Sequence, residues 1–129
     1  MRLKPMVLVV DDTDSLRKLL AADLSKDGSC VVEQASTAAE GLEKAASPDC
    51  AVVVLDMILP DVDGLQFIDQ LCIKRPDPPA IIAITGASET LLPDSIIEGP
   101  YRGIVSAVFR KPIDRDKLRE TVAFCLAGS

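Results

Sequence analysis

The sequence contains no histidine and no tryptophan, and aromatic residues make up only 3% of it. The absence of histidine excludes a Ser-His-Asp or Cys-His catalytic centre, because both need an imidazole as the base. It also excludes a histidine-ligated metal ion and a phosphohistidine carried by this chain. Any functional site in the protein is therefore built without imidazole.

Clustered cysteines, positive charge and long apolar runs are also scarce. The four cysteines show neither a C-x-x-C pair nor metal-ligand spacing, so we expect small buried thiols in a reducing compartment. The net charge of −6 argues against a general nucleic-acid-binding surface. The apolar run Met6–Val10 is too short for a signal peptide or a membrane span. We therefore expect a cytoplasmic protein whose domain binds neither nucleic acid nor membrane.

The length and composition of the chain fit one folded domain. Its 129 residues match the usual size of a compact domain, and 48% of them are hydrophobic, enough for one core. Internal repeats, low-complexity segments and linkers are missing. We expect a single domain over residues 1–129.

Short apolar strands alternate with helical patterns along the chain. The predicted strands are 6–10, 30–34, 51–55, 80–84 and 104–109, and the predicted helices begin at Thr13, Thr37, Leu65 and Asp114. Thr37 and Glu40 form a capping box, whereas either Thr13 or Asp14 is expected to cap the first helix. Gly41 weakens the prediction for the second helix. The segment 88–102 is interrupted by prolines and glycine, so we expect at most a short or distorted helix there.

This alternation predicts a parallel sheet with helices on both faces, because right-handed crossovers place successive strands side by side. The run at 51–55 is continuously apolar, as in a strand buried on both faces, and it ends in Asp56. Ligands of such sheets bind at the carboxyl ends of the strands. The alternative for Asp56 is a residue that opens a turn.

Polar side chains follow four of the predicted strands, namely Asp11 with Asp12, Asp56, Thr85 and Lys111. Three crowded carboxylates repel one another unless a cation is present, and Mg²⁺ accepts one or two carboxylates together with phosphate oxygens. Lys111 and Thr85 would add a positive charge and a hydroxyl donor. The set suits phosphoryl transfer onto a carboxylate. Taken singly, Asp11 could instead cap a helix, Thr85 end a strand and Lys111 be a solvated charge.

These motifs together resemble the receiver domain of two-component response regulators. The matching pieces are Val9-Val10-Asp11-Asp12, the stretch DCAVVVLDMILPDVDG at 49–64, Ile84-Thr85-Gly86 and Arg110-Lys111-Pro112. The resemblance covers the whole chain and implies a flavodoxin-like (βα)5 doubly wound parallel sheet with strand order 2-1-3-4-5. It also implies a signalling protein rather than an enzyme, one that catalyses only its own Mg²⁺-dependent phosphorylation and dephosphorylation.

The resemblance implies a role for each matching position in the acidic pocket. Asp56 would be the phospho-acceptor for a histidine kinase or a phosphotransfer protein. Asp12 would bind Mg²⁺ directly, Asp11 would act through water, and the carbonyl of Ile58 would complete the protein's ligands.

The remaining matches concern the surroundings of that pocket. Thr85 would be the switch hydroxyl and Lys111 the ion-pair partner of the acceptor. Gly86 would leave room for the phosphoryl group. The Lys111–Pro112 bond is often cis in the family, and only a bond before proline adopts that form at low cost.

Two departures from the family concern how phosphorylation would be signalled to a partner protein. The position three before Lys111 usually holds Tyr or Phe, but here it is Val108, with Phe109 beside it. The segment between Thr85 and Lys111 is about one helical turn longer than usual. Partner recognition by this atypical fourth-helix region should therefore be unusual.

A third departure concerns the lifetime of the phosphoryl group. The side chains two beyond Asp56 and two beyond Thr85, Ile58 and Ala87, are apolar and offer no group to orient an attacking water. We therefore expect a long-lived phosphoryl state.

Two alternatives to the switching receiver stay open. A haloacid-dehalogenase-like phosphatase also forms an aspartyl phosphate, but that family has a second Asp two residues after the nucleophile, where this chain has Ile58. A receiver fold that no longer switches would be an interaction module. The cognate kinase, the downstream protein partner and the oligomeric state, including a homodimer, are not determined by the sequence.

Overall fold

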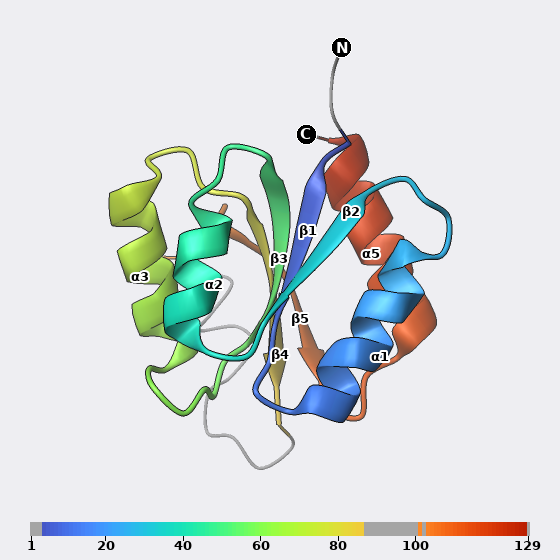
Figure 1. The fold of residues 1–129 in the computed structure, drawn as a ribbon, viewed down its shortest axis with the longest axis horizontal. Helices are drawn as coiled ribbons and strands as arrows, with labels where there is room; N and C mark the ends of the chain where they lie inside the picture. The colour runs from blue at the N-terminus through green and yellow to red at the C-terminus, as the bar shows by residue number, and fades with distance from the viewer. Residues whose placement is uncertain (1–3, 87–100, 102, 129) are drawn as a thin grey trace.

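The computed structural model describes residues 4–86, 101 and 103–128, and strands and helices alternate in it from residue 6 to residue 85 (Figure 1). The strands are β1 (Met6–Val10), β2 (Val31–Ala35), β3 (Cys50–Asp56), β4 (Ala80–Thr85) and β5 (Val105–Arg110). The helices are α1 (Asp14–Ser25), α2 (Ala38–Ala45), α3 (Gly64–Lys74) and α5 (Arg115–Ala127). The predicted strands are therefore confirmed, and no strand end differs from its predicted position by more than one residue.

The strands form one parallel sheet in the order β2-β1-β3-β4-β5, which confirms the predicted topology. β3 lies at the centre of the sheet and pairs with β4 from Val52 opposite Ala80 to Asp56 opposite Ile84. All five strands point the same way, so their carboxyl ends share one edge. The residues predicted to carry chemistry follow these ends.

Helices cover both faces of the sheet, with α2 and α3 on one side and α1 and α5 on the other (Figure 1). Successive side chains of a strand point to opposite faces, so Val53 and Leu55 of β3 pack under α2 and α3, whereas Val52 and Val54 pack under α1 and α5. This double burial explains the continuous apolar run. The edge strand β2 differs, because Val31 and Glu33 are exposed, so the prediction of uniformly apolar strands is wrong there.

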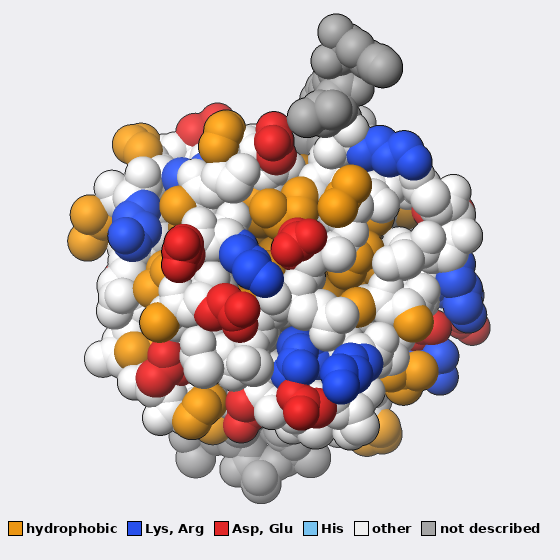
Figure 2. All heavy atoms as spheres, viewed as in Figure 1, with side chains coloured by type: hydrophobic (Ala, Val, Ile, Leu, Met, Phe, Trp, Pro, Cys, Tyr) orange, Lys and Arg blue, Asp and Glu red, His pale blue; other side chains and the backbone are white. Residues whose placement is uncertain are grey.

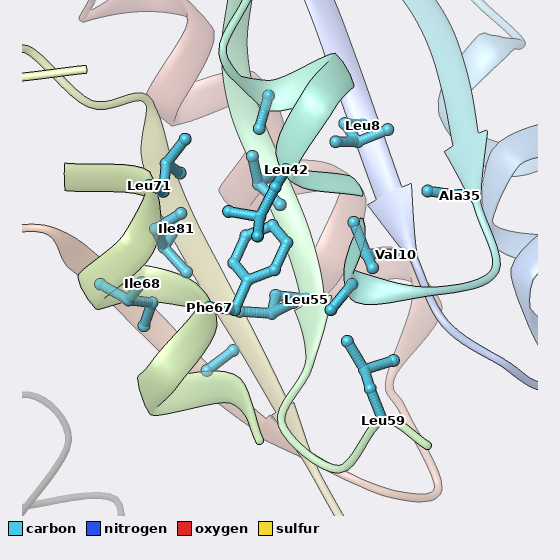
Figure 3. Packing of buried hydrophobic residues seen from close by; sticks show 14 of the residues in the cluster. Leu8, Val10, Ala35, Leu42, Leu55, Leu59, Phe67, Ile68, Leu71 and Ile81 are labelled. Atoms are coloured by element: carbon cyan, nitrogen blue, oxygen red, sulfur yellow. The ribbon is translucent and has the colours of Figure 1, made fainter. Parts of the chain in front are cut away.

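Phe67 lies at the centre of the layer formed by α2, α3 and the sheet (Figure 3). Its ring lies close to Leu42 of α2 and Leu55 of β3. A β-carbon on Gly41 would lie 3.1 Å from the Phe67 ring and 3.0 Å from Val10, so glycine lets α2 approach the sheet closely. The residue that weakens α2 by propensity thus leaves space for the side chains of Val10 and Phe67.

Leu65, Ile68, Leu71 and Cys72 fall at helical spacing and predicted the inner face of α3, but only part of that prediction is confirmed. Ile68 and Leu71 are fully buried, as predicted, but Leu65 and Cys72 are half-buried at its margin, and Phe67 was missed. In α1 the same spacing predicted an inner face of Leu16, Leu19, Leu20 and Leu24, of which Leu20 and Leu24 are buried while Leu19 is exposed. The boundary residues of both helical faces were therefore placed too far inward.

The helix caps are formed by the predicted residues in two cases and not in a third. Thr37 accepts a hydrogen bond from the Glu40 amide, and Asp114 accepts one from the Lys117 amide, which confirms both caps. Thr13 lies at the cap position of α1, but its side chain accepts no capping hydrogen bond. Its amide instead donates to Asp11, which begins the site described below.

The surface shown in Figure 2 mixes acidic and basic side chains over α2 and β2 without a continuous basic patch. None of the described helices is both long and apolar enough to cross a membrane. Cys30 and Cys50 are buried free thiols as expected, whereas Cys72 and Cys125 are only half-buried. Burial raises the pKa of the Cys50 thiol to about 11. The predictions for Ala87, Pro93, Gly99 and Pro100 lie outside the described residues.

Candidate functional site

Three aspartates gather at the carboxyl edge of the sheet. Asp11 and Asp12 follow β1 directly, and Asp56 is the last residue of the neighbouring strand β3. One carboxylate oxygen from each lies within 4.8 Å of the others. Asp11 and Asp56 are buried, whereas Asp12 is exposed. The structure thus brings together the three acidic residues that the sequence predicted.

The Asp56 carboxylate is held by two donors. Its Oδ1 accepts a hydrogen bond from the backbone amide of Ile58 at 3.0 Å, and its Oδ2 lies 3.2 Å from the Lys111 ammonium. Asp56 is only 3% exposed, so a charge there would be costly without such partners. Asp56 is therefore a buried, oriented carboxylate that opens a turn through the Ile58 amide and also pairs with Lys111.

Lys111 is attached to the same edge through the backbone as well as through its side chain. Its amide donates to the carbonyl of Thr85 at 2.9 Å, just past the end of β4. The Lys111–Pro112 peptide bond is cis, as expected. Because its ammonium pairs with Asp56, the alternative of a solvated surface charge is wrong.

Asp11 is the carboxylate whose environment is least satisfied. Its Oδ1 accepts the Thr13 amide at 2.8 Å, while its buried Oδ2 has no hydrogen-bond partner among the described residues. Burial raises the pKa of Asp11, and repulsion from Asp56 and Asp12 adds to that increase. A bare buried carboxylate oxygen beside two other carboxylates is what a hard cation would satisfy.

Thr85 contributes a second unsatisfied group. Its side chain is fully buried at the end of β4, and its Oγ1 has no hydrogen-bond partner within the described part of the chain. Thr85 is the last residue of its strand. Ending a strand does not explain why its buried hydroxyl lacks a hydrogen-bond partner, since buried polar groups are normally hydrogen-bonded. Gly86 follows it and is half-buried.

The loop after Asp56 is tied down at several points. The Met57 amide donates to the carbonyl of Ile84, and the Gly64 amide donates to the carbonyl of Met57 at 2.7 Å. A β-carbon on Gly64 would lie 2.8 Å from the Met57 Cα, so only glycine allows this close approach. Ile58 also forms an isolated backbone bridge with Asp63. The backbone from Met57 to Gly64 is thereby fixed directly after Asp56.

Two polar residues in this region were missed from the sequence. Asp61 bridges to the start of α2, where its two carboxylate oxygens accept the amides of Ala38 and Ala39 at 3.0 and 3.1 Å. These hydrogen bonds lower the pKa of Asp61. Arg17 is buried beneath the Asp11 backbone. Only Arg17 had a signal, since it shares the inward face of α1 with Leu20 and Leu24.

A hollow of about 950 Å³ lies at the opposite edge of the sheet, where the strands begin. It is lined by Pro5, Cys50 and Ala80 at the strand starts and by Phe124 of α5, among others. None of the three clustered aspartates lines it, and ligands of such sheets bind at the other edge. The acidic edge is therefore the better candidate for chemistry.

A family model described as "Response regulator receiver domain" matches residues 7–123. The chain belongs to this family. The receiver domain is 30% identical, over 93% of its length, to Chemotaxis protein CheY of Treponema pallidum, of which it covers 81%. Over 66% of its length it is 38% identical to Protein-glutamate methylesterase/protein-glutamine glutaminase 1 of Oleidesulfovibrio alaskensis, of which it covers 24%.

Solved structures agree with this assignment. A CheY-like response regulator receiver domain protein from Methanospirillum hungatei JF-1 matches with a TM-score of 0.82 and 26% identity, over 98% of this receiver domain and 96% of that chain. The receiver domain spans about a quarter of the length of the methylesterase relative. That relative's enzymatic activity is therefore not transferred to this chain. No finding supports a haloacid-dehalogenase-like phosphatase.

Proposed function

We propose that this receiver domain accepts a phosphoryl group on Asp56 from a histidine kinase or a phosphotransfer protein. The observation that carries the proposal is the buried Asp56 carboxylate, which lies in a cluster with Asp11 and Asp12 and pairs with Lys111. Proteins of this family accept phosphate from kinases and act on downstream partners. The particular kinase and the downstream partner of this chain stay open.

The acidic cluster fits Mg²⁺. The buried, unpartnered Oδ2 of Asp11 can hold the ion through a water molecule, and Asp12 and Asp56 supply two more carboxylates within the same space. The Ile58 carbonyl is the proposed backbone ligand. A bound Mg²⁺ would neutralise negative charge on the carboxylates and on the phosphoryl oxygens.

In the proposed reaction, one oxygen of Asp56 forms a bond to phosphorus while the bond between phosphorus and the donor's imidazole nitrogen breaks. The electron pair of the broken bond goes to that nitrogen. The Lys111 ammonium, already 3.2 Å from Asp56 Oδ2, is placed to pair with the transferred group. Thr85 Oγ1 has no other partner in the described part of the chain, so it is free to donate to a phosphoryl oxygen. The roles of these residues are positioning and charge neutralisation.

Dephosphorylation restores the starting carboxylate. Water attacks phosphorus, the bond to the Asp56 oxygen breaks, and inorganic phosphate leaves. We infer that this step is slow, because the side chain beside the acceptor is Ile58, which has no polar group to orient the water. Mg²⁺-dependent self-phosphorylation and its reversal are then the only reactions proposed for this domain, and its cytoplasmic location stays a prediction.

The test is incubation of the protein with acetyl phosphate and Mg²⁺, followed by intact-mass measurement. We expect one phosphoryl group per chain in the wild type and none in Asp56→Asn. Asp49→Asn is the matched control, since it removes an exposed carboxylate at the opposite end of β3 and should leave uptake unchanged. Uptake that persists in Asp56→Asn would contradict the proposed acceptor. No uptake by the wild type would favour a non-switching interaction module.

A further inference from the structure

Arg17 is a charged residue buried in the core-facing side of α1, with only 8% of its surface exposed. Its Nη1 donates to the backbone carbonyl of Asp11 at 2.9 Å, and its Nε donates to Oε1 of Gln34 on β2 at 3.1 Å. Its Nη2 pairs with Asp14 at 2.6 Å. One guanidinium thus joins the end of β1 to the edge strand and to the first turn of α1.

Stability alone is a weak reason for this arrangement. Burying a charge is costly, and the carboxylate that pairs with Arg17 belongs to Asp14, whose side chain is 70% exposed. Exposed partners contribute little, because water screens them. An apolar residue at position 17 would continue the apolar face of Leu20 and Leu24. The reason for the buried guanidinium is therefore sought in its hydrogen bond to the Asp11 carbonyl.

That contact fixes the backbone between two proposed metal ligands. The Asp11 amide donates to the Ala35 carbonyl at 3.1 Å, and the Asp11 carbonyl accepts from Arg17. Both sides of the Asp11 main chain are therefore held, and its side chain is held as well by the Thr13 amide. The peptide that links Asp11 to Asp12 cannot rotate without breaking one of these bonds.

Arg17 also differs from Lys111 in the kind of oxygen that it contacts. Lys111 binds a carboxylate oxygen of Asp56, whereas Arg17 binds a carbonyl oxygen of Asp11. The second contact leaves the carboxylate oxygens of Asp11 available to a cation. Positive charge is thus brought close to the acidic pair without occupying a ligand atom.

We propose that Arg17 is a positioning residue of the Mg²⁺ site, which orients the Asp11–Asp12 backbone through its bond to the Asp11 carbonyl. The inference rests on the function proposed above. Outer partners of metal ligands typically change metal affinity by about 10- to 100-fold when they are removed. Because Arg17 acts through the main chain of a ligand residue, the lower end of that range, about tenfold, is expected.

Positioning and simple charge effects predict opposite results. If Arg17 acted only as a nearby positive charge, its removal would make Mg²⁺ bind more tightly, because repulsion between two cations would be lost. If Arg17 positions the acidic pair, its removal makes Mg²⁺ bind more weakly. The direction of the change therefore separates the two roles.

The experiment is an Mg²⁺ titration of the metal-free protein followed by backbone amide chemical shifts, for the wild type, Arg17→Met and Arg17→Lys. Arg17→Met should raise the Mg²⁺ dissociation constant by about tenfold. Arg17→Lys should raise it as well, because one ammonium lacks the planar fork that reaches Asp11 and Gln34 together. The control Asp14→Asn removes only the exposed partner and should leave the constant unchanged.

A second readout separates positioning from loss of fold. Saturating Mg²⁺ should restore most of the rate of phosphorylation by acetyl phosphate in Arg17→Met, since the defect lies in binding the metal. Unchanged or tighter binding in a folded Arg17→Met would overturn the inference. If Arg17→Met does not fold, unchanged or tighter binding in Arg17→Lys would overturn it equally.

The proposed metal site is tested separately with Asp12→Asn. Loss of Mg²⁺ binding in Asp12→Asn together with wild-type binding in Arg17→Met would refute the role of Arg17 alone. Wild-type Mg²⁺ binding in Asp12→Asn would refute the metal site itself. The two failures are therefore distinguishable.

Discussion

Replacing Ile58 with asparagine should shorten the life of the phosphoryl group on Asp56. The Ile58 amide donates to the Asp56 carboxylate at 3.0 Å, so the residue is fixed directly beside the acceptor. Its side chain is 53% exposed and therefore accessible to water. A carboxamide at this position can accept a hydrogen bond from a water molecule or donate one to it, whereas the isoleucine side chain can do neither.

The size of the effect follows from the value of one hydrogen bond. A neutral hydrogen bond made in the transition state contributes about 0.5–1.5 kcal/mol, which corresponds to an increase in the hydrolysis rate of about 2- to 13-fold. The folded state should be nearly unaffected, since substitutions of exposed side chains usually change stability by less than about 0.5 kcal/mol. The rate should thus change without a change in melting temperature.

The assay loads the protein with radiolabelled acetyl phosphate, removes the donor and follows the loss of label in Mg²⁺. Ile58→Val is the matched control, because it keeps an apolar β-branched side chain and should decay at the wild-type rate. Equal rates for Ile58→Asn and Ile58→Val would refute the explanation based on water orientation. Loss of label from the wild type within seconds would refute the long-lived state itself.

Two further predictions concern contacts away from the acceptor. Arg75→Met should lower the free energy of unfolding by about 2–3 kcal/mol, measured by chemical denaturation, because the Nη1 of Arg75 donates hydrogen bonds to three backbone carbonyls. Among the described residues, no other side chain is seen to donate to these carbonyls. Arg75→Lys should recover part of the lost stability, and equal stability of the Met and Lys variants would contradict the argument. The hydrogen bonds from Arg115 lower the pKa of Asp23 from 3.8, so this pair stabilises the fold above about pH 4 and the effect is lost as the pH falls through the lowered pKa. The wild type should therefore melt above Asp23→Asn at pH 7, and the difference should shrink in melting curves recorded below pH 4; a difference that grows on acidification would show the wrong sign.

Local patterns were enough to predict the sheet and most of the site. The apolar run that ends in Asp56 identified the central strand, because only a strand covered on both faces tolerates so many apolar residues in succession. The common direction of the strands then placed Asp11 and Asp12 at the same edge. The caps at Thr37 and Asp114 depend on residues three apart, so they were also visible in the sequence.

The missed features depend on contacts between distant segments. Asp61 accepts amides of α2 that lie 22 and 23 residues away, and nothing in a local pattern indicates that partner. Phe67 is central because Gly41 leaves room for its ring on the neighbouring helix. Either Thr13 or Asp14 was expected to cap α1, but the Thr13 side chain makes no capping bond and the Thr13 amide donates to the Asp11 side chain. In each case tertiary packing decided the outcome, not propensity.

The strand β5 limits how a phosphoryl group on Asp56 can be reported. Receivers usually carry an aromatic residue where this chain has Val108, and Phe109 beside it is the nearest substitute. Val108 packs toward the layer of α2 and α3, whereas Phe109 packs toward α1 and α5. Neighbouring residues of a strand point to opposite faces, so Phe109 cannot take the place of an aromatic side chain at 108 without a shift of the strand. A change at Lys111, whose amide is bonded to the Thr85 carbonyl, therefore has no aromatic side chain at position 108 through which to act.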